Sequence, residues 1–236
     1  MDNWLERTLL LMGEEKVERL RNAHVLIVGV GGVGAYAAEM ICRAGVGKMT
    51  IIDGDVVNLS NINRQLVARH STVGHKKVDV LAKRLLDINP ELKLEYRHEF
   101  LHDEITDQLL DNHTYDFIVD AIDTLSPKVH LMLAAKKRKI KIISSMGAGA
   151  RIDPSQVKLA DISDTRECTL AKAVRKRLAK LGVRKGIPVV FSTEAPDRKA
   201  VLLTDNERNK KSTVGTISYM PAIFGCFLAS YVIRKL

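Results

Sequence analysis

The chain has 236 residues, of which 46% are hydrophobic and 28% are charged, so it is long and apolar enough to bury a sizeable core. This composition excludes a disordered or fibrous chain, and no apolar run reaches the ~20 residues that a membrane span requires. The formal net charge of +9 favours a polyanionic partner over an acidic protein or a free cation, although lysine-rich surfaces also occur for solubility alone.

The three cysteines are Cys42, Cys168 and Cys226. They are far apart and form no C-x-x-C pair, which argues against a disulfide framework and against a zinc site built from cysteines. The N-terminal residues also lack the basic and then apolar pattern of a secretory leader. We therefore expect a cytoplasmic protein with no membrane insertion.

Residues 4–23 carry leucines and a valine among charges, which predicts two short helices hinged near Gly13. Arg7 lies in the first of these helices. From this pattern alone, the simplest interpretation of Arg7 is a solvated surface cation.

A glycine-rich turn follows the apolar run 25–28, and its glycines are Gly29, Gly31, Gly32 and Gly34. A helix-like segment continues to Arg43, and a second apolar run ends at Asp53. The order strand, tight turn, helix, strand points the free N–H groups of the helix N-terminus at a phosphate. Asp53 falls about 20 residues after the turn, where a carboxylate can accept hydrogen bonds from ribose hydroxyls. We therefore predict a nucleotide site.

The segment 53–77 places further polar residues at the expected carboxyl edge of the sheet, namely Asp55, Asn61, Arg64, Gln65 and Lys77. Arg64 and Lys77 facing a nucleotide suit a reaction in which charge develops on a departing polyphosphate, and a nicotinamide enzyme has little use for them. Simpler interpretations are a capped turn for Asn61 and Gln65 and a surface helix lysine for Lys77.

The middle of the chain continues the alternation of helix and strand. We predict a helix up to residue 89, a strand over 92–96, a helix over 103–111 and a buried strand over 115–120. Ser126 and Pro127 are typical of an N-cap and a first helical residue. The basic run 136–139 is then most simply explained as cations that complement the helix dipole, and a strand follows over 140–144.

The last third contains a basic amphipathic segment that we predict to be a helix over 169–186. Its cations are Lys172, Arg175, Lys176, Arg177, Lys180, Arg184 and Lys185, and no acidic residue interrupts them. Such a surface suits a tRNA phosphate backbone, although it could also be a solvated or lipid-facing surface. We further predict a mobile loop over 195–213 and an apolar helix over 219–235 that packs on the sheet.

Five motifs occur in order over residues 7 to about 150. They are G-x-G-G-x-G at the glycine turn, D-x-D at Asp53, S-N-x-x-R-Q at residues 60–65, V-G-x-x-K ending at Lys77, and D-x-x-D ending at Asp123. Together they resemble the ThiF, MoeB and HesA type of adenylating enzymes, which are related to the ubiquitin-activating enzymes. The resemblance implies one α/β domain with a Rossmann-like mixed sheet, helices on both faces, and a parallel nucleotide-binding half (1–150) continued by an antiparallel, substrate-side half (151–236).

The resemblance also implies a role for each matched residue. Gly29, Gly31, Gly32 and Gly34 would hold the phosphates of ATP, with Asp53 and Asp55 near the ribose. Asn61, Arg64, Gln65 and Lys77 would line the triphosphate. Asp123 would help to hold Mg²⁺, and Arg7 would reach into the ATP site of the neighbouring subunit of a homodimer.

The last third resembles the TcdA subfamily, the tRNA threonylcarbamoyladenosine dehydratases. The pieces that carry this resemblance begin at Arg151, Ala160, Leu170, Pro188 and Ser218. It implies ATP-dependent cyclisation of N6-threonylcarbamoyladenosine at position 37 of tRNA through a carboxyl-adenylate, with release of AMP and pyrophosphate. It also suggests a sulfur-relay protein as a partner. Cys168 and Thr169 replace the usual Asp-Pro, which leaves the role of Cys168 open. No cysteine stands just before the final helix, which argues against such a relay.

Two other functions stay open on the sequence. The first is adenylation of the C-terminus of a small ubiquitin-like sulfur carrier protein. The second is a binding or redox module that uses NAD, which Asp53 permits but Arg64, Gln65 and Lys77 oppose.

Overall fold

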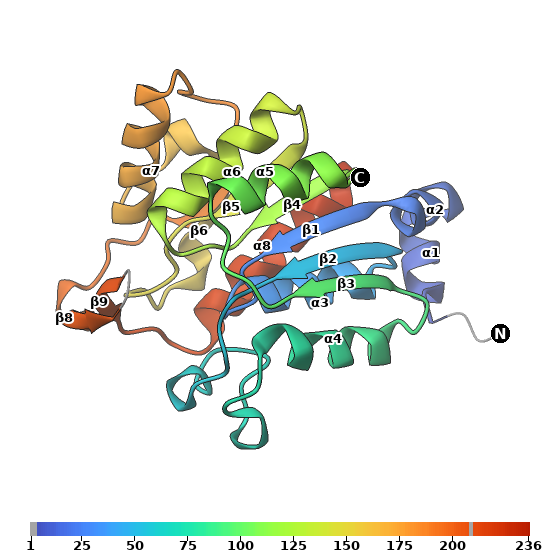
Figure 1. Cartoon of the computed structure of the whole chain (residues 1–236), viewed down its shortest axis with the longest axis horizontal. Coiled ribbons are helices and arrows are strands. Elements are labelled where there is room, and N and C mark those ends of the chain that lie inside the picture. The colour runs from blue at the N-terminus through green and yellow to red at the C-terminus, as the bar shows by residue number, and fades with distance from the viewer. Residues whose placement is uncertain (1–3, 208–209) are drawn as a thin grey trace.

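The computed structural model describes residues 4–207 and 210–236 (Figure 1). Its centre is a seven-stranded sheet in the order β3-β2-β1-β4-β5-β7-β6, in which only β6 runs antiparallel to its neighbour. The strands are β1 (His24–Val28), β2 (Lys48–Ile52), β3 (Lys93–Arg97), β4 (Phe117–Asp120), β5 (Lys141–Ser145), β6 (Val157–Asp161) and β7 (Pro188–Ser192). The expected Rossmann-like mixed sheet is thus confirmed, and its antiparallel part is limited to the β6–β7 pair.

Helices cover both faces of the sheet (Figure 1). One face carries α3 (Gly34–Arg43), α4 (Lys77–Ile88) and α8 (Tyr219–Lys235), and the other carries α5 (Asp103–Asn112), α6 (Leu125–Lys137) and α7 (Thr169–Lys180). Because side chains alternate along a strand, Val25 and Ile27 of β1 pack in the first layer and Leu26 and Val28 in the second. All of these strand residues are buried, which explains the unbroken apolar runs in the sequence.

The N-terminal helices α1 (Glu6–Met12) and α2 (Glu14–Asn22) meet at Gly13, whose positive φ of 80° makes the expected hinge. The side chain of Leu5 lies against Gly45, two residues after the end of α3. Since α3 ends where β2 is about to begin, α1 lies at the amino edge of the sheet, as Figure 1 shows. Leu10 and Leu11 of α1 are 82% and 85% exposed.

Helix α8 packs closely on α3 and on the glycine turn. A Cβ on Gly225 would lie 2.5 Å from the carbonyl oxygen of Val33, so only glycine allows this approach. Pro221, one turn earlier on α8, lies against Gly32, where an added Cβ would be 3.1 Å from the proline ring. The C-terminal helix predicted over 219–235 is confirmed, and it packs against the glycine turn.

Two predicted helix boundaries are wrong. Helix α6 begins at Leu125 with Thr124 as N-cap, so Ser126 and Pro127 lie inside its first turn. Helix α7 ends at Lys180 instead of continuing to residue 186, because Gly182 takes the left-handed conformation that stops a helix, with φ of 81°. Arg184 and Lys185 therefore lie in the loop after α7.

The predicted loop over 195–213 contains regular structure. Strands β8 (Val201–Glu207) and β9 (Lys210–Val214) form an antiparallel hairpin separate from the main sheet, and residues 208 and 209 lie outside the described part of the chain.

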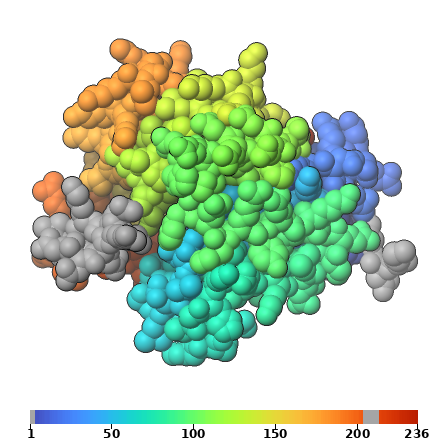
Figure 2. All heavy atoms as spheres, in the orientation of Figure 1, coloured from blue at the N-terminus to red at the C-terminus, as the bar shows by residue number. Residues whose placement is uncertain are grey.

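In the space-filling view, surface atoms of α6 and α7 adjoin along the upper part of the molecule (Figure 2). Among the described residues, no helix is long and apolar enough to cross a bilayer.

Candidate nucleotide-binding active site

The glycine turn lies between the carboxyl end of β1 and the start of α3, at the point where the strand order reverses between β1 and β4. Gly29 has a φ of 86°, and a Cβ on it would lie 2.8 Å from the carbonyl oxygen of Ala121 in the loop after β4. A Cβ on Gly34 would lie 1.7 Å from the carbonyl oxygen of Gly29. By contrast, a Cβ on Gly31 would meet only the Gln65 side chain, at 3.7 Å. Gly29 and Gly34 thus shape the turn, and Gly31 leaves space beside Gln65.

Asp53 follows the last residue of β2 and is hydrogen-bonded to the glycine turn. Its Oδ2 accepts a hydrogen bond from the backbone N–H of Val30 at 2.8 Å, and its Oδ1 accepts one from the N–H of Asp55 at 2.8 Å. Burial raises the pKa of the Asp53 carboxyl, while the nearby Lys77 charge and these two hydrogen bonds lower it. The acidic residue expected at this strand end therefore touches the turn that would hold the phosphates.

Lys77 begins α4, and its ammonium is buried beside the same strand end. Its Nζ lies 2.7 Å from Oδ2 of Asp55, and the whole residue is only 4% exposed. The simpler interpretation of Lys77 as a surface helix lysine is therefore wrong. The ammonium has three donors, so the bond to Asp55 leaves it able to donate to a ligand at this strand end.

The residues 59–65 form a short 3-10 turn, η1 (Leu59–Asn61), and its continuation. Asn61 is buried, and its side-chain oxygen accepts a hydrogen bond from the N–H of Asn58 at 3.1 Å, so Asn61 does cap a turn. Within the described part of the chain, the buried Oε1 of Gln65 has no hydrogen-bond partner. A buried polar atom without a partner is costly, and this one lies beside Gly31, so it marks a position for a polar ligand.

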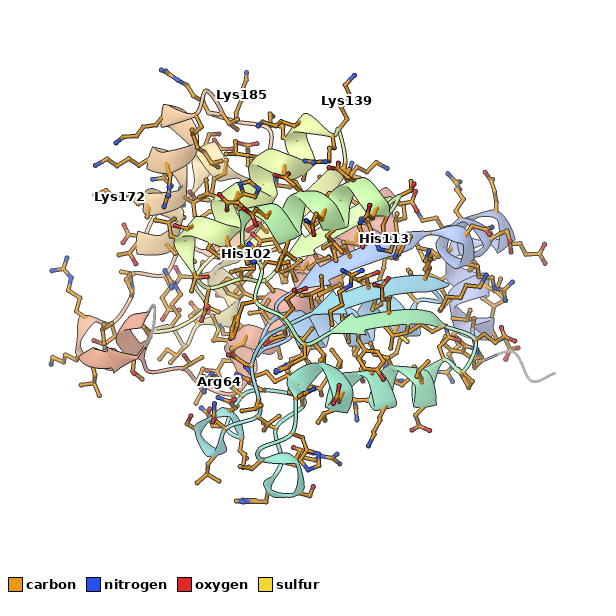
Figure 3. All side chains as sticks on the ribbon, viewed as in Figure 1. Arg64, His102, His113, Lys139, Lys172 and Lys185 are labelled. Atoms are coloured by element: carbon orange, nitrogen blue, oxygen red, sulfur yellow. The ribbon has the colours of Figure 1, made fainter. Side chains whose placement is uncertain are left out.

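Arg64 lies at the same edge of the sheet, as Figure 3 shows. Its guanidinium donates hydrogen bonds of 2.8 Å to the carbonyl oxygen of Ser60 and to the side chain of Asn63. Burial lowers the pKa of Arg64, and the charge of Asp123 opposes that shift. Asp123 lies in the loop after β4, where the carbonyl oxygen of Ala121 lies against Gly29. The structure thus brings Arg64 and Asp123 to one edge with the glycine turn.

A buried network surrounds Asp120, the first residue of the D-x-x-D motif, and its partners Lys128 and Ser144 were not predicted. Asp120 accepts hydrogen bonds from Nζ of Lys128 at 2.7 Å, from Oγ of Ser144 at 2.6 Å and from the N–H of Ile122 at 3.0 Å. Lys128 and Asp120 are both fully buried. The sequence did carry a signal, because Lys128 stands on the same helical face as Leu131, Met132 and Ala135.

The substrate side of the site is organised by Arg151, which is 4% exposed. Its guanidinium donates to the carbonyl oxygens of Gly147 and Gly149 at 3.0 Å each, and to those of Glu167 and Glu194. Cys168 is the N-cap of α7, and its Sγ accepts from the N–H of Ala171 at 3.4 Å. Neither role was predicted, because both depend on segments that are distant in sequence.

The predicted tRNA-binding cations divide into three groups. Lys172, Lys176, Arg177 and Lys180 are exposed on α7, and Lys172 extends away from the molecule in Figure 3. Arg175 turns inward and donates to the carbonyl oxygen of Thr165 at 2.7 Å, so it anchors the segment before α7. Arg184 and Lys185 are exposed in the loop that follows.

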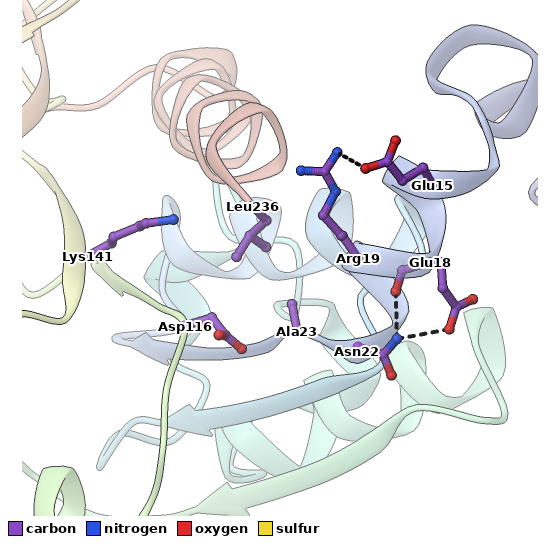
Figure 4. A pocket seen from close by; sticks show the side chains of 8 residues that line it. All are labelled: Glu15, Glu18, Arg19, Asn22, Ala23, Asp116, Lys141 and Leu236. Atoms are coloured by element: carbon purple, nitrogen blue, oxygen red, sulfur yellow. Dashed lines mark hydrogen bonds and ion pairs between the residues drawn. The ribbon is translucent and has the colours of Figure 1, made fainter.

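Arg7 is not brought to this site within the single chain, since α1 lies at the amino edge of the sheet and the glycine turn lies at the carboxyl edge (Figure 1). A cavity of about 490 Å³ also lies at the amino edge, between α2 and the starts of β4 and β5 (Figure 4). Its lining includes Glu18, Arg19, Asp116 and Lys141. This cavity is therefore remote from the predicted nucleotide site.

The family profile of ThiF matches residues 5–236. The chain belongs to the ThiF family. Within this family it is 40% identical to the tRNA threonylcarbamoyladenosine dehydratase of Bacillus subtilis, over 98% of this chain and 93% of the relative. It is 34% identical to the Escherichia coli enzyme of that name, over 100% of this chain and 95% of the relative.

Solved structures agree with this placement in the ThiF family. The crystal structure of the Escherichia coli dehydratase, TcdA, in complex with ATP has a TM-score of 0.89 to this chain, with 33% sequence identity. It covers 100% of this chain and 95% of that one. The molybdopterin-synthase adenylyltransferase of Salmonella typhimurium is 34% identical, but over only 62% of this chain. The resemblance to the TcdA subfamily is therefore confirmed along the whole chain.

Proposed function

We propose that this protein is an ATP-dependent dehydratase that cyclises N6-threonylcarbamoyladenosine in tRNA through a carboxyl-adenylate. The observation that carries the proposal is the convergence of Lys77, Arg64 and Asp123 on the edge of the sheet that holds the glycine turn. Cations at that position favour departure of pyrophosphate. The identity to named tRNA threonylcarbamoyladenosine dehydratases over 98% of the chain supports the choice of substrate.

The chemistry uses two displacements. First, the carboxylate oxygen of the threonylcarbamoyl group attacks the α-phosphorus of ATP, and the bond to pyrophosphate breaks. Arg64 and Lys77 stabilise the negative charge that moves onto pyrophosphate, and the N-terminus of α3 faces the phosphates. A nucleophile on the modified base's own side chain then attacks the acyl carbon, and AMP leaves. Because this nucleophile is already tethered, its effective concentration is high and no enzyme thioester is needed.

Magnesium fits this site as an ion shared between ATP and one carboxylate. Among residues 4–207 and 210–236, no group of three or more potential ligands is gathered for a metal. Mg²⁺ is commonly bound by one or two carboxylates together with substrate phosphates, so Asp123 would hold it in this way. When bound, the ion would supply charge that neutralises the leaving group.

Asp53 and Gln65 would recognise the nucleotide. Asp53 already accepts two backbone hydrogen bonds, and its remaining lone pairs suit ribose hydroxyls. Gln65 would satisfy its buried Oε1 against the ligand beside Gly31. We assign Asn61 the supporting role of fixing the turn that carries Arg64, since its side chain is used as a cap.

We also propose a homodimer in which Arg7 completes the site of the partner subunit. Within one chain, α1 contributes no buried residue, and Leu10 and Leu11 present apolar surface next to Arg7. A second copy that covers these leucines would bring Arg7 to a new environment. A sulfur-relay partner receives no support from Cys168, which is used as a helix cap, or from Cys42, which is buried, whereas Cys226 is exposed on α8.

Pyrophosphate release tests the proposal. Release that requires ATP and tRNA bearing threonylcarbamoyladenosine is expected, and release that instead requires a small carrier protein ending in two glycines would contradict it. The Gly31→Ala variant sharpens the test, because the added Cβ meets only Gln65 at 3.7 Å and the fold should be unchanged. This variant should keep its melting temperature without ligand but lose the stabilisation by ATP, and NAD should stabilise neither protein.

A further inference from the structure

The end of α6 contacts the loop that follows α7, and both carry cations that the catalytic site does not use. We call the group Lys136, Lys137, Lys139, Arg184 and Lys185 the basic shoulder. The two parts are in contact, because Nζ of Lys136 donates a hydrogen bond of 3.3 Å to the carbonyl oxygen of Lys185. Lys139 and Lys185 both extend outward at the top of Figure 3, and surface atoms of α6 and α7 adjoin there in Figure 2.

The two helices end with the same backbone motif. In α7, the N–H groups of Gly182 and Val183 donate to the carbonyl oxygens of Ala179 and Leu178. In α6, the N–H groups of Lys139 and Ile140 donate in the same way to Lys136 and Ala135. This motif needs a left-handed residue, and glycine is the usual choice. Helix α7 uses Gly182, with φ of 81°, whereas α6 places Lys139 there, with φ of 57°.

A lysine in this conformation is strained relative to glycine, as are Ala150 and Glu167, which have φ of 58° and 51°. Attraction to the helix dipole explains Lys136 and Lys137, which lie in the last turn of α6. It does not explain why a lysine occupies the left-handed position beyond that turn. The dipole interpretation of the run 136–139 thus leaves Lys139 unexplained.

The cations of the shoulder are available to a partner. Arg138 is the exception in its run, since Asp107 and Asp111 neutralise it at 3.0 and 2.8 Å. In the described part of the chain, Lys137, Lys139, Arg184 and Lys185 form no ion pair, and all four are exposed. Asp161 lies at the base of the loop, but its carboxylate accepts hydrogen bonds from the N–H groups of Gly186 and Ile187.

The shoulder lies at the far end of α6 from the active site. Helix α6 begins two residues after Asp123, and its 13 residues span about 20 Å. An RNA whose modified base enters the site thus has several backbone phosphates within this length. Helix α7 carries further exposed cations, of which Lys172 extends outward in Figure 3, so positive charge is also present between the start of α7 and the shoulder.

We infer that the basic shoulder binds the phosphate backbone of the tRNA stem, away from the loop that carries the reacting base. This inference rests on the proposed function and deepens it, because it separates the contacts that hold the stem from the contacts that hold the modified base. Phosphate contacts of this kind position a substrate without reading its sequence.

The test compares two triple variants that each remove three positive charges. The shoulder variant is Lys137→Gln, Lys139→Gln and Lys185→Gln, and the matched control is Lys48→Gln, Lys83→Gln and Lys93→Gln on β2, α4 and β3. For tRNA bearing the modified adenosine, the shoulder variant should raise KM by about tenfold or more at low salt and leave kcat unchanged. The slope of log affinity against log salt should fall by about 2.

A second substrate distinguishes binding of the tRNA stem from binding of the loop that carries the modified base. An oligonucleotide that contains only the loop with the same modified adenosine should give the shoulder variant and the unaltered protein the same KM. An unchanged KM for tRNA, an equal rise in the control variant, or an equal rise with the loop oligonucleotide would overturn the inference. Loss of binding to phosphatidylserine vesicles with an unchanged KM for tRNA would overturn it too, and would make the shoulder a lipid contact.

Lys139→Gly is a further test, and this variant should fold because glycine favours the left-handed conformation. Glycine should relieve the left-handed strain and raise the melting temperature, while the KM for tRNA rises. A higher melting temperature with an unchanged KM would show that Lys139 serves only the helix end. If the unaltered protein does not turn over modified tRNA at all, the proposed function fails. If it does and these variants behave like the unaltered protein, only the inference about the shoulder fails.

Discussion

Nζ of Lys77 and Oδ2 of Asp55 lie 2.7 Å apart at the start of α4, and the Lys77 side chain is buried while that of Asp55 is 45% exposed. The pair places an ammonium close to Asp53, since the charge of Lys77 lowers the pKa of that carboxyl. Water can solvate Asp55 if its partner is lost. Loss of Lys77 should therefore affect the activity of the site more than the stability of the fold.

We expect Lys77→Met to lower the rate of pyrophosphate release by about 100- to 1,000-fold, because one charged donor to the leaving group is lost. Lys76→Met is the matched control, since Lys76 is the exposed neighbour. Steady-state pyrophosphate release with modified tRNA measures both. Equal losses in the two variants would contradict the assignment of Lys77.

Lys128→Met should lower the free energy of unfolding by about 3–5 kcal/mol, because it leaves the carboxylate of Asp120 buried without its cation. The double variant Lys128→Met with Asp120→Asn should recover part of this loss, because the buried charge is then removed as well. Urea denaturation measures both values. A double variant as unstable as the sum of the two single variants would show that the pair is not coupled.

Arg7→Ala and Asp123→Ala should each abolish activity as pure proteins, but mixtures should regain it. A mixed dimer contains one site with an intact pocket and an Arg7 from its partner, so equal mixing should give about a quarter of the normal activity. The measurement is pyrophosphate release after co-refolding. If Arg7 acts on its own subunit's site, every site in the mixture carries a defect and no activity returns.

His24 should make stability depend on pH. Its Nδ1 donates to the carbonyl oxygen of Thr114 at 2.9 Å, so its Nε2 accepts from the hydroxyl of Thr50 at 2.9 Å and the ring is neutral. Burial lowers the pKa of His24 from 6.5 to about 4. Between these values the unfolded chain binds the extra proton, so stability should fall as the pH falls from 6.5 toward 4.

Thermal unfolding across this pH range measures the effect. His24→Gln is the control, and it should flatten the part of the profile between pH 4 and 6.5. An unchanged profile in that variant would mean that other groups cause the pH dependence.

The sequence was sufficient for the parts of the site that follow from local chemistry. The glycines at 29–34 must form a tight turn between a strand and a helix, and Asp53 must end the next strand, so both positions were predicted correctly. The hinge at Gly13 was also predicted from a local signal. In each case, the residue types themselves determine the backbone.

Tertiary contacts explain what the sequence did not reveal. Lys128 was overlooked because its partners Asp120 and Ser144 come from two different strands. The basic helix was predicted to be too long because cations continue past Gly182, and charge pattern alone does not show where a helix ends. The hairpin of β8 and β9 was predicted to be a loop because its residues are mostly polar.

The contact of α8 with the glycine turn has a consequence for biosynthesis. Pro221 lies on Gly32, and Gly225 lies on the backbone of Val33, so residues late in the chain support a turn made from early ones. A nascent chain must be synthesised through α8 before this support exists, although the turn itself leaves the ribosome much sooner. ATP should therefore fail to protect ribosome-bound fragments that stop short of residue 219.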